Sequence, residues 1–158
     1  MYISGCRGAR RSIDSRSFAR SRAHTRARGM ILTRGRVLVV EDEIEVAATL
    51  LELLVERNYE VLTATTAEEG LKAVPAFRPN VVLLDISLPD MSGPSALTVF
   101  CRAHPRVPVI AVTSAVDAGV LAKLAEMEPF HVVHKPFDID ALDRLVNSAV
   151  GQSKTRSA

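Results

Sequence analysis

The chain has 158 residues, of which 47% are hydrophobic and 24% are charged, so it suits one domain with a sizeable core and a modest appendage. Only 4% of the residues are aromatic and none is tryptophan, which argues against the stacking surfaces that bind single-stranded nucleic acid. No apolar run approaches the roughly 20 residues of a membrane-spanning helix. Two cysteines, Cys6 and Cys101, are too few for a disulfide framework or a zinc site, so we expect a reducing, cytoplasmic location.

The net charge of +2 hides a segregation of charge along the sequence. Residues 1–35 contain nine arginines and one acid, Asp14, whereas residues 36–158 contain eleven basic and seventeen acidic residues. Residues 1–29 lack a repeating apolar pattern, so we expect them to be disordered. Three interpretations stay open: a nucleic-acid-binding arm, an organelle transit peptide, or a stretch that is no natural part of the protein. Met30 favours the third, because a start there leads directly into the first apolar run.

Beyond Arg36, short apolar runs alternate with longer segments of helical period, a pattern typical of an α/β protein with a parallel sheet. The runs are rich in β-branched residues and mostly lack polar alternation, as expected of strands that are covered on both faces. They predict five strands, at Val37–Val40, Glu60–Ala64, Val81–Leu84, Val109–Val112 and Phe130–His134.

Helical segments separate and follow these strands. Thr66 and Glu69 resemble a capping box, and Pro94 suits the first turn of a helix. We expect five helices: Ile44–Arg57, Thr66 to about Phe77, Pro94 to His104, Ser114 or Asp117 to about Met127, and one capped by Asp138. The folded domain is expected to span residues 36–150, with 1–35 as a disordered extension and 151–158 as a flexible tail.

Polar residues follow four of the five apolar runs. Glu41 and Asp42 come after the first run and Asp85 after the third. Thr113 follows the fourth run and Lys135 the fifth. The carboxyl ends of parallel strands share one edge of a sheet, and ligands bind there where the strand order reverses. With a strand order of 2-1-3-4-5, the first and third strands are neighbours at that reversal, so the three acids are expected to converge.

Three carboxylates in one crevice repel one another. Unit charges ~4 Å apart repel by roughly 4 kcal/mol at an effective dielectric near 20, so such a cluster requires a cation or shifted protonation. A site with oxygen ligands alone suits Mg²⁺. Any one acid after a strand is usually a loop or capping residue, but three acids, a threonine and a lysine after four buried runs predict a joint site.

Four sequence blocks carry a resemblance to a known family: VLVVEDE, VVLLDISLPDMSG, VIAVTS and HKPF. In order and spacing they resemble the signature blocks of the receiver domain of response regulators in two-component signalling. The resemblance runs from about Arg36 to Val150. It implies a flavodoxin-like, doubly wound five-stranded parallel sheet of order 2-1-3-4-5 with five helices, in agreement with the elements above.

The resemblance also implies a role for each residue of the joint site. Asp85 is the expected phosphoacceptor, whose carboxylate becomes an aspartyl phosphate. Thr113 is the expected switch hydroxyl, and Lys135 the ammonium group that pairs first with Asp85 and then with the phosphoryl group. The expected Mg²⁺ ligands are Glu41 (through a water), Asp42, Asp85 and the backbone carbonyl of Ser87.

One position departs from the family pattern. Three residues before Lys135, where many members have a tyrosine or phenylalanine that swings inward on activation, this sequence has Val132. His131 and His134 flank it, but a histidine at a strand is more often structural than a switch. We therefore expect a different packing rearrangement to carry the signal onward from Thr113.

The resemblance further implies a function. We expect a stand-alone, chemotaxis-type regulator that takes part in a phosphorelay, since the residues after Val150 are too few for an output module. Its expected partners are a sensor histidine kinase or histidine phosphotransfer protein and a downstream protein target, without membrane insertion. We expect no enzyme activity beyond weak self-phosphotransfer and self-dephosphorylation. The alternative is a receiver-like interaction module that is never phosphorylated, with the basic arm contacting nucleic acid in a salt-dependent way.

Overall fold

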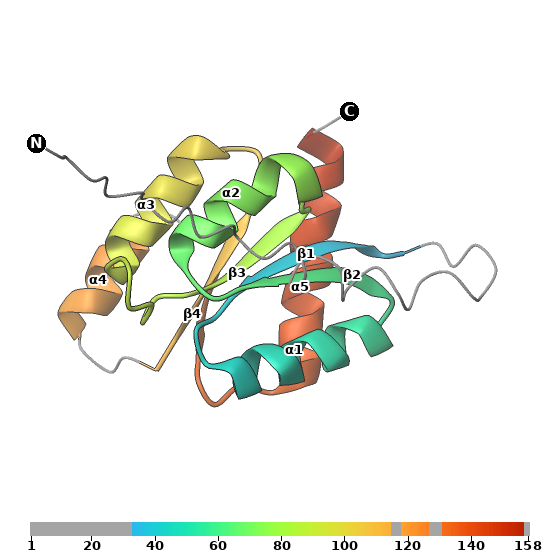
Figure 1. Cartoon of the computed structure of the whole chain (residues 1–158), viewed down its shortest axis with the longest axis horizontal. Coiled ribbons are helices and arrows are strands. Elements are labelled where there is room, and N and C mark those ends of the chain that lie inside the picture. Colours follow the sequence, from blue (N-terminus) through green and yellow to red (C-terminus); the bar gives the residue numbers. More distant parts are fainter. Residues whose placement is uncertain (1–32, 115–117, 127–130, 157–158) are drawn as a thin grey trace, which may run out of the picture. The chain divides into compact units, whose positions relative to one another are not determined.

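A computed structural model of the chain describes residues 33–114, 118–126 and 131–156, and these contain a five-stranded parallel sheet (Figure 1). The order β2-β1-β3-β4-β5 confirms the predicted flavodoxin-like topology. The predicted strand bounds agree within two residues with those observed, which are β1 (Gly35–Val40), β2 (Tyr59–Ala64), β3 (Val81–Asp85), β4 (Val109–Thr113) and β5 (His131–His134). Phe130, the predicted start of the last strand, lies outside the described residues.

The register of the strands brings their carboxyl ends to one edge. Val40, the last residue of β1, lies opposite both Ala64 of β2 and Leu84 of β3. On the other side of β3, Asp85 lies opposite Val112. The residues that directly follow β1 and those that end β3 and β4 therefore lie at the same edge of the sheet.

The helices cover both faces of the sheet, as strands with two buried faces require (Figure 1). Their observed bounds are α1 (Ile44–Glu56), α2 (Ala67–Phe77), α3 (Gly93–Ala103), α4 (Ala118–Glu126) and α5 (Ile139–Arg156). One core cluster joins the sheet to α1 and α5, and includes Leu54, Leu83 and Leu142. The other joins the sheet to α2, α3 and α4, and includes Leu84 and Phe100.

The first turn of α2 is held by side chains. Thr66 Oγ1 accepts the N–H of Glu69 at 3.1 Å, as the predicted capping box requires. The return bond differs, because Glu69 Oε2 accepts the N–H of Thr65 at 2.8 Å. Two of the bounds predicted for the fourth helix, Asp117 at its start and Met127 at its end, lie outside the described residues.

The predicted tail from Gly151 onward was wrong for residues 151–156, which continue α5. Glycine inside a helix costs roughly 0.5–1 kcal/mol relative to alanine, and tertiary contacts offset that cost here. Ser153 is buried, and Lys154 Nζ donates to the backbone carbonyl of Arg34 at 3.0 Å. Arg34 lies 120 positions from Lys154 in the sequence, so the local signal of a glycine predicted the end of the helix too early.

The predicted disordered extension also reached too far, because Gly35 is the first residue of β1. Arg34, directly before it, pairs with Asp143 of α5 at 2.9 Å and lies over the ring of Tyr59, with its guanidinium carbon 4.7 Å from the ring centroid. These contacts hold Arg34 in place, although it precedes the first apolar run of the sequence. The prediction for residues 1–32 falls outside the described residues. Within the described part, no helix has both the length and the hydropathy to cross a bilayer.

Candidate functional site

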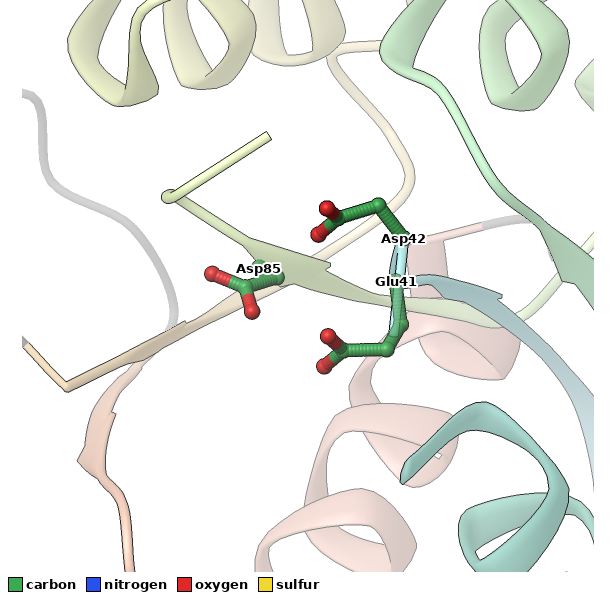
Figure 2. Close-up of side chains that lie close together, drawn as sticks. All are labelled: Glu41, Asp42 and Asp85. Carbon is green, nitrogen blue, oxygen red and sulfur yellow. The ribbon is translucent and has the colours of Figure 1, made fainter. Parts of the chain in front are cut away.

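Three carboxylates lie together at the carboxyl edge of the sheet. Glu41 and Asp42 directly follow β1, and Asp85 ends β3. One carboxylate oxygen from each residue lies within 4.8 Å of those of the other two. Figure 2 shows the three side chains close together, with Glu41 and Asp42 from the end of β1 beside Asp85 from the end of β3. The convergence expected from the strand order is therefore present in the structure.

Lys135, directly after β5, supplies a positive charge between two of these acids. Its Nζ donates to Asp85 Oδ2 at 2.6 Å and to Glu41 Oε2 at 2.8 Å. Its backbone N–H donates to the carbonyl of Thr113 at 2.8 Å, which fixes the start of the side chain. The Lys135–Pro136 peptide bond is cis.

Asp85 is 4% exposed, and both of its carboxylate oxygens have partners. Oδ2 accepts from Lys135, and Oδ1 accepts the backbone N–H of Ser87 at 2.7 Å. The next residue, Ile86, donates its backbone N–H to the carbonyl of Val112 at 3.0 Å. The carboxylate is therefore oriented by its own loop on one side and by the β5–α5 connection on the other.

Burial and charge set the electrostatics of the site. Burial raises the pKa of Glu41, the hydrogen bond from Lys135 opposes that rise, and the negative charge of Asp85 adds to it. Burial alone lowers the pKa of Lys135, but the hydrogen bonds that its ammonium donates to Asp85 and Glu41, together with the charges of these acids, outweigh it, so the pKa is raised overall. Lys135 is thus held as a cation, and one cation faces three carboxylates.

The donor set fits a small divalent cation. The three carboxylates offer only oxygen ligands, which suit Mg²⁺, and one ammonium leaves an excess of negative charge that a further cation would balance. Asp42 is half-buried, so the cluster is reachable from solvent on that side. Ser87, the fourth expected contributor, is exposed and lies two residues after Asp85.

Thr113 ends β4 and is fully buried. It lies opposite His134, the residue before Lys135. The structure therefore brings the expected hydroxyl, ammonium and acidic residues to one edge of the sheet, from the ends of β1, β3, β4 and β5.

The loop after Asp85 depends on a glycine for space. A Cβ at Gly93 would lie 2.5 Å from both the carbonyl oxygen and the Cβ of Ile86. Glycine is therefore required here because the backbone of the loop approaches Ile86 closely. Ile86 and Leu88, which belong to this loop, are buried.

Val132, which stands where the family pattern has a tyrosine or phenylalanine, is half-buried. Val132 packs against the core cluster on the α2, α3 and α4 face. His131 and His134 on either side are exposed. Val132 thus contributes an aliphatic side chain to that cluster.

Sequence reasoning missed the direct bond between Glu41 and Lys135, and expected Glu41 to act through a water. The two residues are 94 positions apart, so no local signal links them. The signal that could have found the bond is the position of both residues at the sheet edge, since a buried acid needs a cationic or donor partner.

Comparisons with known proteins point to the family that the sequence blocks resemble. The family model of the response regulator receiver domain matches residues 37–147. The DNA-binding transcriptional regulator NtrC of Escherichia coli K12 is 34% identical over 122 residues, which are 75% of this chain and 25% of that protein. The transcriptional regulatory protein KdpE of Mycobacterium tuberculosis H37Rv is 34% identical over 114 residues, 72% of this chain and 50% of that protein.

Solved structures of receiver domains also resemble this chain. A CheY-like receiver domain protein from Methanospirillum hungatei JF-1 superposes with a TM-score of 0.71 at 26% identity, over 77% of this chain and 97% of that chain. The chain spans a quarter to a half of the length of the two curated relatives described above.

Proposed function

Since the chain belongs to the response-regulator receiver family, whose members are phosphoacceptors in signalling, we propose that Asp85 accepts a phosphoryl group from a histidine kinase or a histidine phosphotransfer protein. The observation that carries the proposal is the environment of Asp85. Its carboxylate is buried at the carboxyl edge of the sheet, bonded to Lys135 at 2.6 Å, and grouped with Glu41 and Asp42.

The proposed step is a transfer between two nucleophiles. A carboxylate oxygen of Asp85 attacks the phosphorus of a phosphohistidine and forms an O–P bond, while the P–N bond breaks and its electron pair stays on the imidazole nitrogen. The phosphoryl group moves as a unit, so no redox partner or external oxidant is needed. Buried placement of Asp85 limits the access of water to the new acyl phosphate.

The residues around Asp85 are proposed to balance the negative charge of its carboxylate and of the incoming phosphoryl group. Lys135 pairs with Asp85 and Glu41 before transfer, and its flexible ammonium can follow the phosphoryl oxygens afterward. Glu41, Asp42, Asp85 and the Ser87 carbonyl would hold Mg²⁺, which when bound supplies neutralising charge for the entering phosphoryl oxygens. Acidic side chains alone would repel the donor.

Thr113 is the proposed switch residue. It is buried at the end of β4, and its backbone carbonyl accepts from Lys135, so a new anion on Asp85 would draw both the hydroxyl and the ammonium toward one point. The loop after β4 would move with Thr113. Because Val132 offers only aliphatic packing, the rearrangement is proposed to pass through that packing rather than through an aromatic side chain.

The first helix is the proposed docking surface for the phosphodonor protein. Ile44 is 76% exposed and Val55 is 48% exposed, so α1 presents apolar side chains to solvent beginning beside the site. Exposed apolar residues on a helix favour packing against another helix. The downstream protein target and the stand-alone role stay predictions.

Intact-mass measurement tests the proposal. The full chain is incubated with Mg²⁺ and a small acyl phosphate, in parallel with Asp85→Asn and with Asp140→Asn, which alters an exposed acid of α5 outside the site. We expect one phosphoryl group on the unsubstituted chain and on Asp140→Asn, and none on Asp85→Asn. Equal labelling of all three, or labelling of none, contradicts the proposal and favours a module that acts without phosphorylation.

A further inference from the structure

Asp90, in the loop between β3 and α3, caps a helix that belongs to another part of the chain. Its Oδ1 accepts the backbone N–H of Ala67 at 3.1 Å, and its Oδ2 accepts that of Glu68 at 3.2 Å. Ala67 and Glu68 are the first two residues of α2. The next N–H, that of Glu69, goes to Thr66. Two segments therefore share the capping of one helix end.

The contact is chemically favourable. The first N–H groups of a helix have no partner within it, and the helix dipole places partial positive charge at that end. A carboxylate that accepts two such N–H groups makes charge-assisted bonds, which are stronger than neutral ones. Asp90 is exposed, so it meets α2 at the protein surface without the burial of an unpaired charge.

Asp90 fastens an exposed stretch of the loop that lies between apolar anchors. Nearer Asp85, the loop is fixed by burial of Ile86 and Leu88, and at its far end by the close approach of Gly93 to Ile86. Between these anchors Met91 packs against the core, whereas Pro89 and Asp90 are exposed, and Asp90 bonds this exposed stretch to α2.

We propose that Asp90 is a positioning residue, which ties the phosphoacceptor loop to the N-terminus of α2 and thereby fixes the Ser87 backbone against Asp85. The Ser87 N–H bonds to Asp85 Oδ1 at 2.7 Å, and its carbonyl is the expected fourth metal ligand. The inference rests on the proposed function for its consequence in metal binding. The positioning of Ser87 itself is a property of the metal-free chain.

The structure offers a matched control. Thr66→Ala removes a capping bond from the same turn of α2 without touching the loop after Asp85, whereas Asp90→Ala removes the two bonds that the loop makes. Both changes weaken the same helix end. Asp90→Asn keeps a carbonyl oxygen that can accept one N–H, and it serves as the conservative variant if Asp90→Ala folds poorly.

Two measurements on the full chain test the inference. Hydrogen exchange without metal reports on the Ser87 N–H, and calorimetric titration with Mg²⁺ alone reports on affinity. We expect Asp90→Ala to speed Ser87 exchange and to weaken Mg²⁺ binding roughly tenfold, as loss of an outer-shell partner does, with Asp90→Asn in between. Thr66→Ala is expected to lower the melting temperature without either effect.

Equal changes in Asp90→Ala and Thr66→Ala would show a merely structural role and overturn the inference, as would no change in either readout for Asp90→Ala. If the unsubstituted chain binds no Mg²⁺ while Asp90→Ala still speeds Ser87 exchange, the proposed metal-dependent function fails and the positioning of Ser87 stands.

Discussion

Lys135 and Lys72 make ion pairs of the same length in different surroundings. Each has its Nζ 2.6 Å from a carboxylate oxygen, of Asp85 and of Glu68 respectively. The Lys72 pair is more than two thirds exposed on α2, whereas the acids that face Lys135 are almost fully buried. Burial, and not distance, decides how strongly each lysine contributes to stability.

Lys135→Ala is expected to lower the free energy of unfolding by about 3 kcal/mol in EDTA, because it leaves Glu41 and Asp85 buried without their cation. Lys72→Ala is expected to change it by at most about 0.5 kcal/mol. Urea unfolding of both variants checks the difference. Addition of Mg²⁺ should recover part of the loss in Lys135→Ala, since ligands that bind the native state stabilise it. Equal effects of the two substitutions would contradict the assigned role of Lys135.

Tyr59 carries a buried hydroxyl at the start of β2. The side chain is 3% exposed, and its oxygen has no hydrogen-bond partner among the described residues. Burial and the charge of Asp143 raise the pKa of Tyr59 to about 12, against the opposing charges of Arg34 and Arg57. The folded chain thus keeps the phenol proton to higher pH than the unfolded chain, whose tyrosine ionises near pH 10.

The raised pKa makes stability dependent on alkaline pH. The contribution is fully present below pH ~10 and is lost as the pH rises toward ~12, because the unfolded state gives up the proton first. We expect Tyr59→Phe to match the unsubstituted chain at neutral pH within about 1 kcal/mol, since the hydroxyl has no partner to lose. At pH ~12 the variant should be more stable by about 2 kcal/mol. Urea unfolding across this range measures both, and parallel pH profiles would refute the assignment.

At the scale of elements, two helical glycines are expected to respond oppositely to alanine. In α2, a Cβ at Gly70 would lie 2.8 Å from Val40 Cγ2 and 3.1 Å from Phe100 Cζ, whereas one at Gly151 of α5 would meet nothing within 4 Å. Gly70→Ala should destabilise the chain by about 1–3 kcal/mol through overpacking. Gly151→Ala should stabilise it by about 0.5–1 kcal/mol through helix propensity. Thermal unfolding checks the signs, and a shared sign would contradict the packing described.

The elements themselves were largely predictable from the sequence, since strands buried on both faces show continuous apolar runs. The joint site followed from the order of those strands, because Glu41, Asp85 and Lys135 each follow an apolar run. Features that depend on distant contacts were not predictable. The continuation of α5 past Gly151 and the capping of α2 by Asp90 both rest on residues more than 20 positions away in the sequence.

On the scale of the whole molecule, the sheet, its helices and the site belong to one compact unit within residues 31–158. All the core residues described above belong to this unit. The arginine-rich part of the sequence comes before the residues that carry the sheet and the site.

Removal of residues 1–29, so that the chain starts at Met30, is expected to leave the melting temperature and the phosphoryl labelling of Asp85 unchanged. The reason is that the core clusters and the acidic site are built from residues after Arg34. Calorimetry and intact mass compare the two chains. A lower melting temperature or weaker labelling in the shorter chain would show that the basic segment contributes to the domain.

The burial of Glu41 and Asp85 around Lys135 also separates two kinds of electrostatic behaviour in one domain. Dissolved ions screen exposed charges beyond about 8 Å at physiological ionic strength, but they screen groups shielded from solvent far less. The exposed acids of α1, such as Glu45 and Glu52, belong to the first kind. Ionic strength should therefore change how fast a charged protein partner finds the domain while leaving the interior lysine–carboxylate contacts almost untouched.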